Sequence, residues 1–304
     1  MNRFYKTGLI ILIFCFNFAG YLSGRGNTPG ENIKTNFINY HNIDKTRQIT
    51  RGRGVKVVVL DWMFNIKSDS SGKYIDPVSL VPNQDIGVYK PWHGEWMAEI
   101  IHQIAPDCKI IPVRARPASV ENEDALSEKP YEKYIIEGIG LAADKGAVAV
   151  TNSMGPLKQS EELNKAVRYA EKRGTVFIDV HPEYLKIENK RYVLCDSVQL
   201  NSLIVHCGIV SVPEYPRKPD PLRDIYTWPY QINPVYKDGW GYSNGPPIVA
   251  GVIALMKAVN SDLSVRQIKK ILIRTARNEN GFKVLDAEAA VKESLKCKEI
   301  SLEK

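Results

Sequence analysis

The chain has 304 residues, of which 44% are hydrophobic and 25% charged, and its formal net charge is +7. This composition is typical of a globular protein with one large domain or two small ones, and it excludes a disordered or fibrous chain. The basic residues are spread along the sequence without a long basic block. We therefore interpret the charge as solvated surface charge and expect no nucleic-acid partner.

The first 24 residues have the pattern of an export signal. Arg3 and Lys6 precede an apolar run at 8–16, and small residues follow between positions 19 and 24. This arrangement predicts a secretory signal peptide. The alternative is an uncleaved signal anchor, because no clean Ala-x-Ala cleavage site is present. We expect a periplasmic or extracellular protein, which contacts a membrane only if this segment is retained.

Four cysteines remain if the signal is removed: Cys108, Cys195, Cys207 and Cys297. An even number in an exported protein permits disulfides, and Cys195 and Cys207 are close enough in sequence to join adjacent strands. The alternative is that all four are small buried hydrophobic side chains. No Cys-x-x-Cys or His-x-x-x-His spacing indicates zinc.

Strands and helices are predicted to alternate from residue 55 onward. β-branched and apolar runs predict strands at 55–60, 109–113, 147–150, 175–178 and 203–212, the last as a strand pair or one bent strand. Helical apolar spacing predicts helices at 93–104, 131–145, 161–173, 247–259, 264–276 and from 286, with Gly146 and Gly174 as C-caps. The alternation predicts an α/β fold, with a mostly parallel central sheet in a three-layer α/β/α arrangement.

Three other segments are expected to connect or flank this domain. Residues 25–50 are polar and are expected to form a linker or an arm on the domain surface, and 65–90 read as a turn-rich insert. Residues 213–240 are rich in Pro, Tyr and Trp and are interpreted as a loop that is a candidate docking surface for a partner protein. We expect one domain over 51–296, followed by a charged tail at 297–304.

Candidate chemistry lies at the strand ends, where functional residues gather in open α/β sheets. Asp61 ends the first strand, His93 begins a helix, and Ser243 precedes an apolar helix. Backbone N–H groups and the dipole at a helix start favour the negative charge of an activated serine and of an oxyanion. Asp, His and Ser are the groups that acyl transfer requires. His102 and His206 are expected to be structural.

The motifs around these residues resemble those of the subtilisin-like (subtilase, peptidase S8) serine proteases. Residues 57–61 resemble the strand that ends in the family's catalytic Asp, and 93–98 resemble its His-Gly-Thr-x-Val-Ala motif. Residues 241–247 resemble Gly-Thr-Ser-Met-Ala-x-Pro, and the order Asp, His, Ser is that of subtilisin. Residues 151–155 resemble the Asn-x-Ser-Leu-Gly segment, whose backbone pairs with substrate in this family.

The resemblance implies a subtilisin-like fold and a serine endopeptidase that acts on peptides or proteins through an acyl-enzyme intermediate. The site residues that it implies are Asp61, His93 and Ser243 for catalysis and Ser153, Met154 and Gly155 for substrate binding. Many family members bind calcium, but the sequence has no clear acidic loop for it, so no cofactor is assigned.

The family's oxyanion-hole Asn has no counterpart in this sequence. At that place the chain reads Asp-Val-His-Pro-Glu over 179–183, so His181 or a protonated Glu183 is the alternative donor, whereas an ionised Glu183 would repel the oxyanion. Loss of one such donor costs ~10²–10³ in rate. The alternative function is therefore a catalytically impaired pseudoprotease that binds peptides or proteins.

Overall fold

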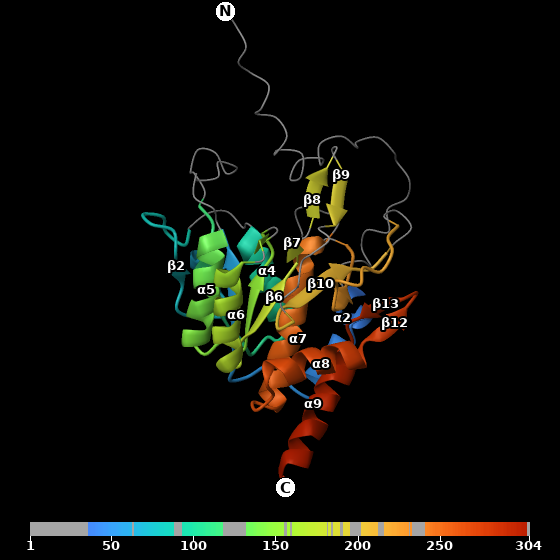
Figure 1. Cartoon of the computed structure of the whole chain (residues 1–304). Helices are drawn as coiled ribbons and strands as arrows, with labels where there is room; N and C mark the ends of the chain where they lie inside the picture. The colour runs from blue at the N-terminus through green and yellow to red at the C-terminus, as the bar shows by residue number, and fades with distance from the viewer. Residues whose placement is uncertain are drawn as a thin grey trace, which may run out of the picture.

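The computed structural model describes residues 36–302, except 63, 88–92, 118–131, 155–156, 159, 181, 184, 189–190, 195–201, 212–215, 231 and 233–240. Within this part of the chain, a nine-stranded sheet has the order β12-β13-β11-β10-β6-β4-β1-β3-β2 (Figure 1). Its strands are β1 (Lys56–Asp61), β2 (Val78–Ser79), β3 (Lys109–Arg114), β4 (Ala149–Asn152), β6 (Val176–Asp179), β10 (Val205–Ile209), β11 (Ile225–Thr227), β12 (Arg277–Glu279) and β13 (Phe282–Val284).

The sheet is parallel except at one edge, where β12 and β13 form an antiparallel hairpin. Two further pairs lie outside it: β5 (Leu157–Lys158) runs parallel to β7 (Pro182–Glu183), and β8 (Leu185–Glu188) runs antiparallel to β9 (Arg191–Leu194). The parallel arrangement brings the carboxyl ends of β1, β4 and β6 to the same edge of the sheet.

Helices cover both faces of the sheet (Figure 1). One face packs against α4 (His93–Ile104), α7 (Gly245–Val259), α8 (Val265–Thr275) and α9 (Ala287–Leu302). The other packs against α5 (Glu132–Asp144) and α6 (Glu161–Lys172). Short helices complete the described chain: α2 (Asn36–Tyr40), α3 (Ile43–Arg47), η2 (Ile66–Ser68) and η3 (Tyr242–Asn244). The predicted three-layer α/β/α fold is confirmed.

The sequence of β1 explains why it is central. Successive side chains of a strand point to opposite faces, and Val57 and Val59 join the core on one side while Val58 and Leu60 join the core on the other. Burial on both faces is typical of parallel strands between helical layers. The strand ends at Asp61, so this carboxylate emerges from the middle of the molecule.

The helix α7 is buried along almost its whole length, as its continuous apolar sequence predicts. It crosses α4 closely: a Cβ on Gly251 would lie 2.8 Å from the Ile104 Cβ, so the absence of a side chain permits the approach. This packing fixes the start of α7 relative to α4, the helix that His93 begins.

The predicted glycine C-caps are confirmed, because Gly146 and Gly174 have φ of 68° and 78°, in the left-handed region that glycine adopts without strain. In the described residues 203–211, where a strand pair or one bent strand was expected, there is one strand, β10. The sequence analysis missed β11, inside the expected loop 213–240, and the β12–β13 hairpin. It also missed the short strands β2, β5, β7, β8 and β9 and the short helices α2, α3, η2 and η3.

The segment expected as a linker or surface arm packs into the domain where it is described. Phe37 and Ile43 are fully buried members of the same core as α7. The helix α9 continues to Leu302, through most of the expected tail. Cys108 and Cys207 are buried thiols, while Cys195 lies outside the described residues. Among the described helices, none has the length and apolar character needed to cross a membrane; the expected signal segment lies outside them.

Candidate active site

Asp61 and His93 form a contact at the carboxyl end of β1. The carboxylate of Asp61 is fully buried, and its Oδ2 lies 2.8 Å from His93 Nδ1. The other oxygen, Oδ1, accepts a hydrogen bond of 2.9 Å from the Trp62 backbone N–H. Both carboxylate oxygens therefore have partners, and the one that faces His93 holds the imidazole by Nδ1, which leaves Nε2 pointing away from the carboxylate.

An aromatic and cationic stack packs against the imidazole. The Trp62 ring lies parallel to the His93 ring, with centroids 4.9 Å apart and 15° between the planes. The guanidinium carbon of Arg116 lies 4.6 Å from the Trp62 ring centroid, within the range of a cation–π interaction. The stack restricts rotation of the imidazole about its side-chain bonds, so it adds to the orientation that Asp61 provides.

Ser243 lies in η3, immediately before α7. Pro246 and Pro247 occupy the first turn of α7, where the N–H that proline lacks has no helical partner. Ser243 Oγ donates a hydrogen bond of 3.3 Å to the Ser153 carbonyl, and Ser153 Oγ donates one of 2.9 Å to the Ser243 carbonyl. These two reciprocal bonds join the start of α7 to the segment after β4.

That segment is held by a buried side-chain bond between neighbouring strand ends. Asn152 Nδ2 donates a hydrogen bond of 2.9 Å to Asp179 Oδ1, across the β4–β6 pair. Asn152 Oδ1 accepts a bond of 3.3 Å from the Met154 N–H. The backbone at 152–154 is therefore fixed beside Ser243, where the resemblance expects substrate to bind.

A buried cluster of charges supports the first turn of α4. Glu95 Oε2 accepts hydrogen bonds from the Tyr74 hydroxyl (2.6 Å) and the Asn65 N–H (3.3 Å). Lys73 Nζ lies 3.4 Å from Glu95 Oε1 and 3.1 Å from Asp69 Oδ1. Burial alone would raise the pKa of Asp69, but hydrogen bonds from Ser71 and Lys73 hold it well below its usual range. The cluster thus fixes the turn that carries His93.

The structure brings five of the eight predicted site residues to this edge of the sheet: Asp61, His93, Ser153, Met154 and Ser243. Gly155 and His181 lie outside the described residues. The Glu183 backbone pairs with Lys158 in the β5–β7 ladder. In the described part of the chain, no group of three or more His, Cys, Asp and Glu side chains is arranged to hold a metal ion.

Sequence reasoning missed the Trp62–Arg116 stack and the Asn152–Asp179 bond as parts of the site. The available signal was position, because each of the four residues lies at or just beyond the carboxyl end of a central strand. Nothing in the sequence indicated which of them would meet.

Comparison with a family model identifies the segment around Ser243. Residues 226–290 match the model described as the subtilase family. No curated protein sequence matches the chain.

Solved structures that share this fold include proteases. The MycP3 protease from the type VII (ESX-3) secretion system has a TM-score of 0.65 and 19% identity, covering 88% of this chain and 89% of that one. A protease from Pseudoalteromonas arctica has a TM-score of 0.65 and 18% identity, covering 88% and 100%. Fervidolysin from Fervidobacterium pennivorans has a TM-score of 0.63 and 17% identity, covering 82% and 44%. The chain therefore has the subtilisin-like fold, and its match at 226–290 confirms the resemblance to the subtilase family.

Proposed function

We propose that the chain is a serine endopeptidase with Asp61, His93 and Ser243 as its catalytic triad. The observation that carries the proposal is the 2.8 Å contact between His93 Nδ1 and a carboxylate that is fully buried. A carboxylate in this position orients the imidazole and stabilises the imidazolium that forms during acyl transfer. The subtilase-family match over 226–290, which includes Ser243, supports the assignment of the nucleophile.

In the proposed reaction, His93 Nε2 takes the proton of Ser243 Oγ as this oxygen attacks the substrate carbonyl. The imidazolium then gives the proton to the leaving amine, and an acyl-enzyme remains on Ser243. Water repeats the sequence and releases the acid. In the structure, Ser243 Oγ donates to the Ser153 carbonyl, so this hydroxyl must rotate towards His93 before attack.

The oxyanion would form at the start of α7, where the Ser243 N–H and the helix dipole favour negative charge. The family's Asn donor has no counterpart at 179–183 in this sequence. Absence of one such donor lowers the catalytic rate by a factor of ~10²–10³. We therefore expect a slow protease, unless the segment that contains His181 and Glu183 supplies the second donor.

The proposed substrate is an extended peptide that pairs with the backbone at Ser153, Met154 and Gly155 as an added strand. We also propose that the N-terminal 24 residues direct export. Two solved structures with chains of this fold come from secretion systems: the MycP3 protease and the periplasmic assembly of the ESX-5 inner membrane complex. Their location supports a periplasmic or extracellular role and an assembly partner for this chain.

A fluorophosphonate probe tests the triad, because it reacts covalently with activated serines. We expect the full chain to be labelled once, at Ser243, and labelling to disappear in Ser243→Ala and His93→Ala. The matched control is Ser261→Ala, which removes an exposed serine beyond α7 and should leave labelling unchanged. Absence of labelling in the folded wild-type chain would overturn the enzyme proposal in favour of the pseudoprotease alternative.

A further inference from the structure

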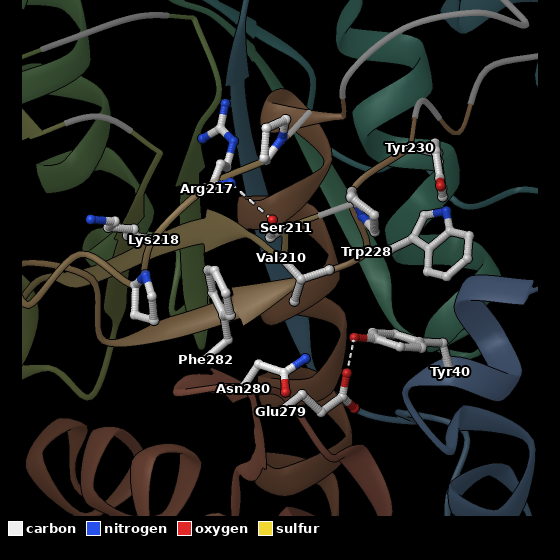
Figure 2. Close-up of a pocket in the computed structure, with 13 residues that line it drawn as sticks. Tyr40, Val210, Ser211, Arg217, Lys218, Trp228, Tyr230, Glu279, Asn280 and Phe282 are labelled. Atoms are coloured by element: carbon white, nitrogen blue, oxygen red, sulfur yellow. Dashed lines mark hydrogen bonds between the residues drawn. The ribbon is translucent and has the colours of Figure 1, made fainter. Parts of the chain in front are cut away.

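A pocket of about 650 Å³ opens between the ends of β10 and β11, the β12–β13 hairpin and α2 (Figure 2). Its lining includes residues of the predicted docking loop 213–240, but none of Asp61, His93, Ser153 and Ser243. The pocket is therefore a separate concavity from the candidate active site.

Aromatic and proline rings form much of the pocket wall. Trp228 lines one side of it, with edge-on contacts to Tyr40 at 5.1 Å and to Tyr230 at 5.3 Å between ring centroids. Phe282 faces the cavity from the hairpin. Pro216 and Pro219 flank Arg217 and Lys218 in the chain and also line the cavity. Walls of this kind bind extended peptides that contain proline or aromatic side chains, because rigid rings lose little entropy on contact.

The charges around the opening favour an anion. Lys218 is exposed on one rim and forms no ion pair within the described part of the chain. The neighbouring Arg217 is half-buried, and its guanidinium carbon lies 4.1 Å from the Tyr242 ring centroid. Glu279 is the only carboxylate among the described lining residues. It accepts a 2.6 Å hydrogen bond from the Tyr40 hydroxyl and lies 3.0 Å from an Arg277 nitrogen, so its charge is compensated within the fold. The opening thus presents net positive charge to a ligand.

The pocket wall is hydrogen-bonded to the loop that carries Ser243. The Pro229 carbonyl accepts a 2.7 Å bond from the Gly241 N–H, and the Tyr230 carbonyl accepts a 2.8 Å bond from Asn244 Nδ2. These donors lie on either side of Ser243. A ligand in the pocket would therefore contact residues that are hydrogen-bonded to the loop on either side of Ser243.

We propose that this pocket binds an extended peptide in which acidic side chains lie beside proline or aromatic residues. The peptide would be a segment of a protein substrate that docks away from the bond to be cleaved. The role of the pocket in substrate docking rests on the proposed protease function, whereas its binding of the peptide does not.

The test measures fluorescence anisotropy of a dye-labelled peptide with alternating Asp, Pro and Trp, added to the full chain carrying Ser243→Ala. The matched peptide has Lys in place of Asp. We expect the acidic peptide to bind at least about tenfold more tightly, and binding to weaken as salt is raised. Lys218→Glu should weaken it about five- to tenfold, whereas the control Lys283→Glu reverses an exposed charge on β13 outside the pocket and should leave it unchanged.

Three results would overturn the proposal: no binding of the acidic peptide, equal binding of the Lys peptide, or equal loss in both charge-reversal variants. Sedimentation of the unliganded chain tests a different occupant, a second copy of this chain. Dimers that form with the wild type and dissociate in Lys218→Glu would assign the pocket to that copy and overturn the peptide proposal. Labelling of the wild-type chain by the fluorophosphonate probe is a separate readout. Failure of the protease proposal is therefore distinguishable from failure of this one.

Discussion

Two buried histidines should make the fold sensitive to mild acid. His206, in β10, is 2% exposed, and neither ring nitrogen has a hydrogen-bond partner among the described residues. Burial, together with the nearby charges of Lys269 and Arg223, lowers its pKa from 6.5 to about 3. His41 is fully buried; its Nδ1 lies 2.8 Å from the Leu285 carbonyl, and its Nε2 accepts a bond from the Trp228 N–H.

Burial lowers the pKa of His41 to about 4, despite the opposing hydrogen bond to Leu285. Both folded-state pKa values lie below 6.5, so the unfolded chain binds more protons as pH falls. The stability that depends on these two neutral histidines is therefore fully present above pH 6.5. It is lost as the pH falls towards their folded-state pKa values, about 4 for His41 and about 3 for His206. From pH 7 to pH 5, each imidazole lowers the free energy of unfolding by about 2 kcal/mol, and the two together lower it by about 4 kcal/mol, at about 1.4 kcal/mol per pKa unit. A typical unfolding free energy is only about 5–15 kcal/mol.

The assay is urea unfolding at pH 7 and pH 5, followed by tryptophan fluorescence, for the wild-type chain and His206→Leu. The variant should be at least as stable as the wild type at pH 7, because it removes buried polar nitrogens that lack partners. Its loss of stability between the two pH values should be about 2 kcal/mol smaller. An equal loss in both proteins would show that His206 does not contribute to the acid sensitivity.

Three further predictions concern the site itself. A Cβ at Gly241 would lie 2.4 Å from the Tyr230 carbonyl oxygen, so Gly241→Ala should lower the unfolding free energy by about 1–3 kcal/mol in urea titrations; an unchanged midpoint would contradict this. Trp62→Leu should slow fluorophosphonate labelling more than Trp62→Phe, because only the second keeps a ring against His93; equal rates would exclude a stacking role. Asp61→Asn should slow labelling by ~10³–10⁴ while the fold survives in circular dichroism, and near-normal labelling would remove Asp61 from the triad.

The sequence predicted the elements that rest on local patterns. The β-branched run before Asp61 matches β1, and the apolar spacing after His93 matches α4. Gly146 and Gly174 were identified as C-caps because a left-handed residue there favours glycine. These features depend only on residues that are close in sequence, so the amino-acid sequence is enough to predict them.

The missed elements depend on partners far away in the chain. The strand β11 has only three residues inside a Pro- and Tyr-rich region, and it is stabilised by pairing with β10 and β13. Phe37 and Ile43 lie in a polar stretch, yet they are buried against elements from the other end of the sequence. In the site, the contact of Trp62 with Arg116 joins residues from the ends of two neighbouring strands. Such contacts follow from the fold, and no local pattern predicts them.

Peptide cleavage is the most direct readout of a working triad of Asp61, His93 and Ser243. A peptide library incubated with the wild-type chain and with Ser243→Ala is compared by mass spectrometry for new internal termini. A working triad should give cleavage products with the wild type, at a low rate, and none with the variant. Identical peptide maps from both, with a folded wild-type chain, would exclude the protease and favour the pseudoprotease alternative.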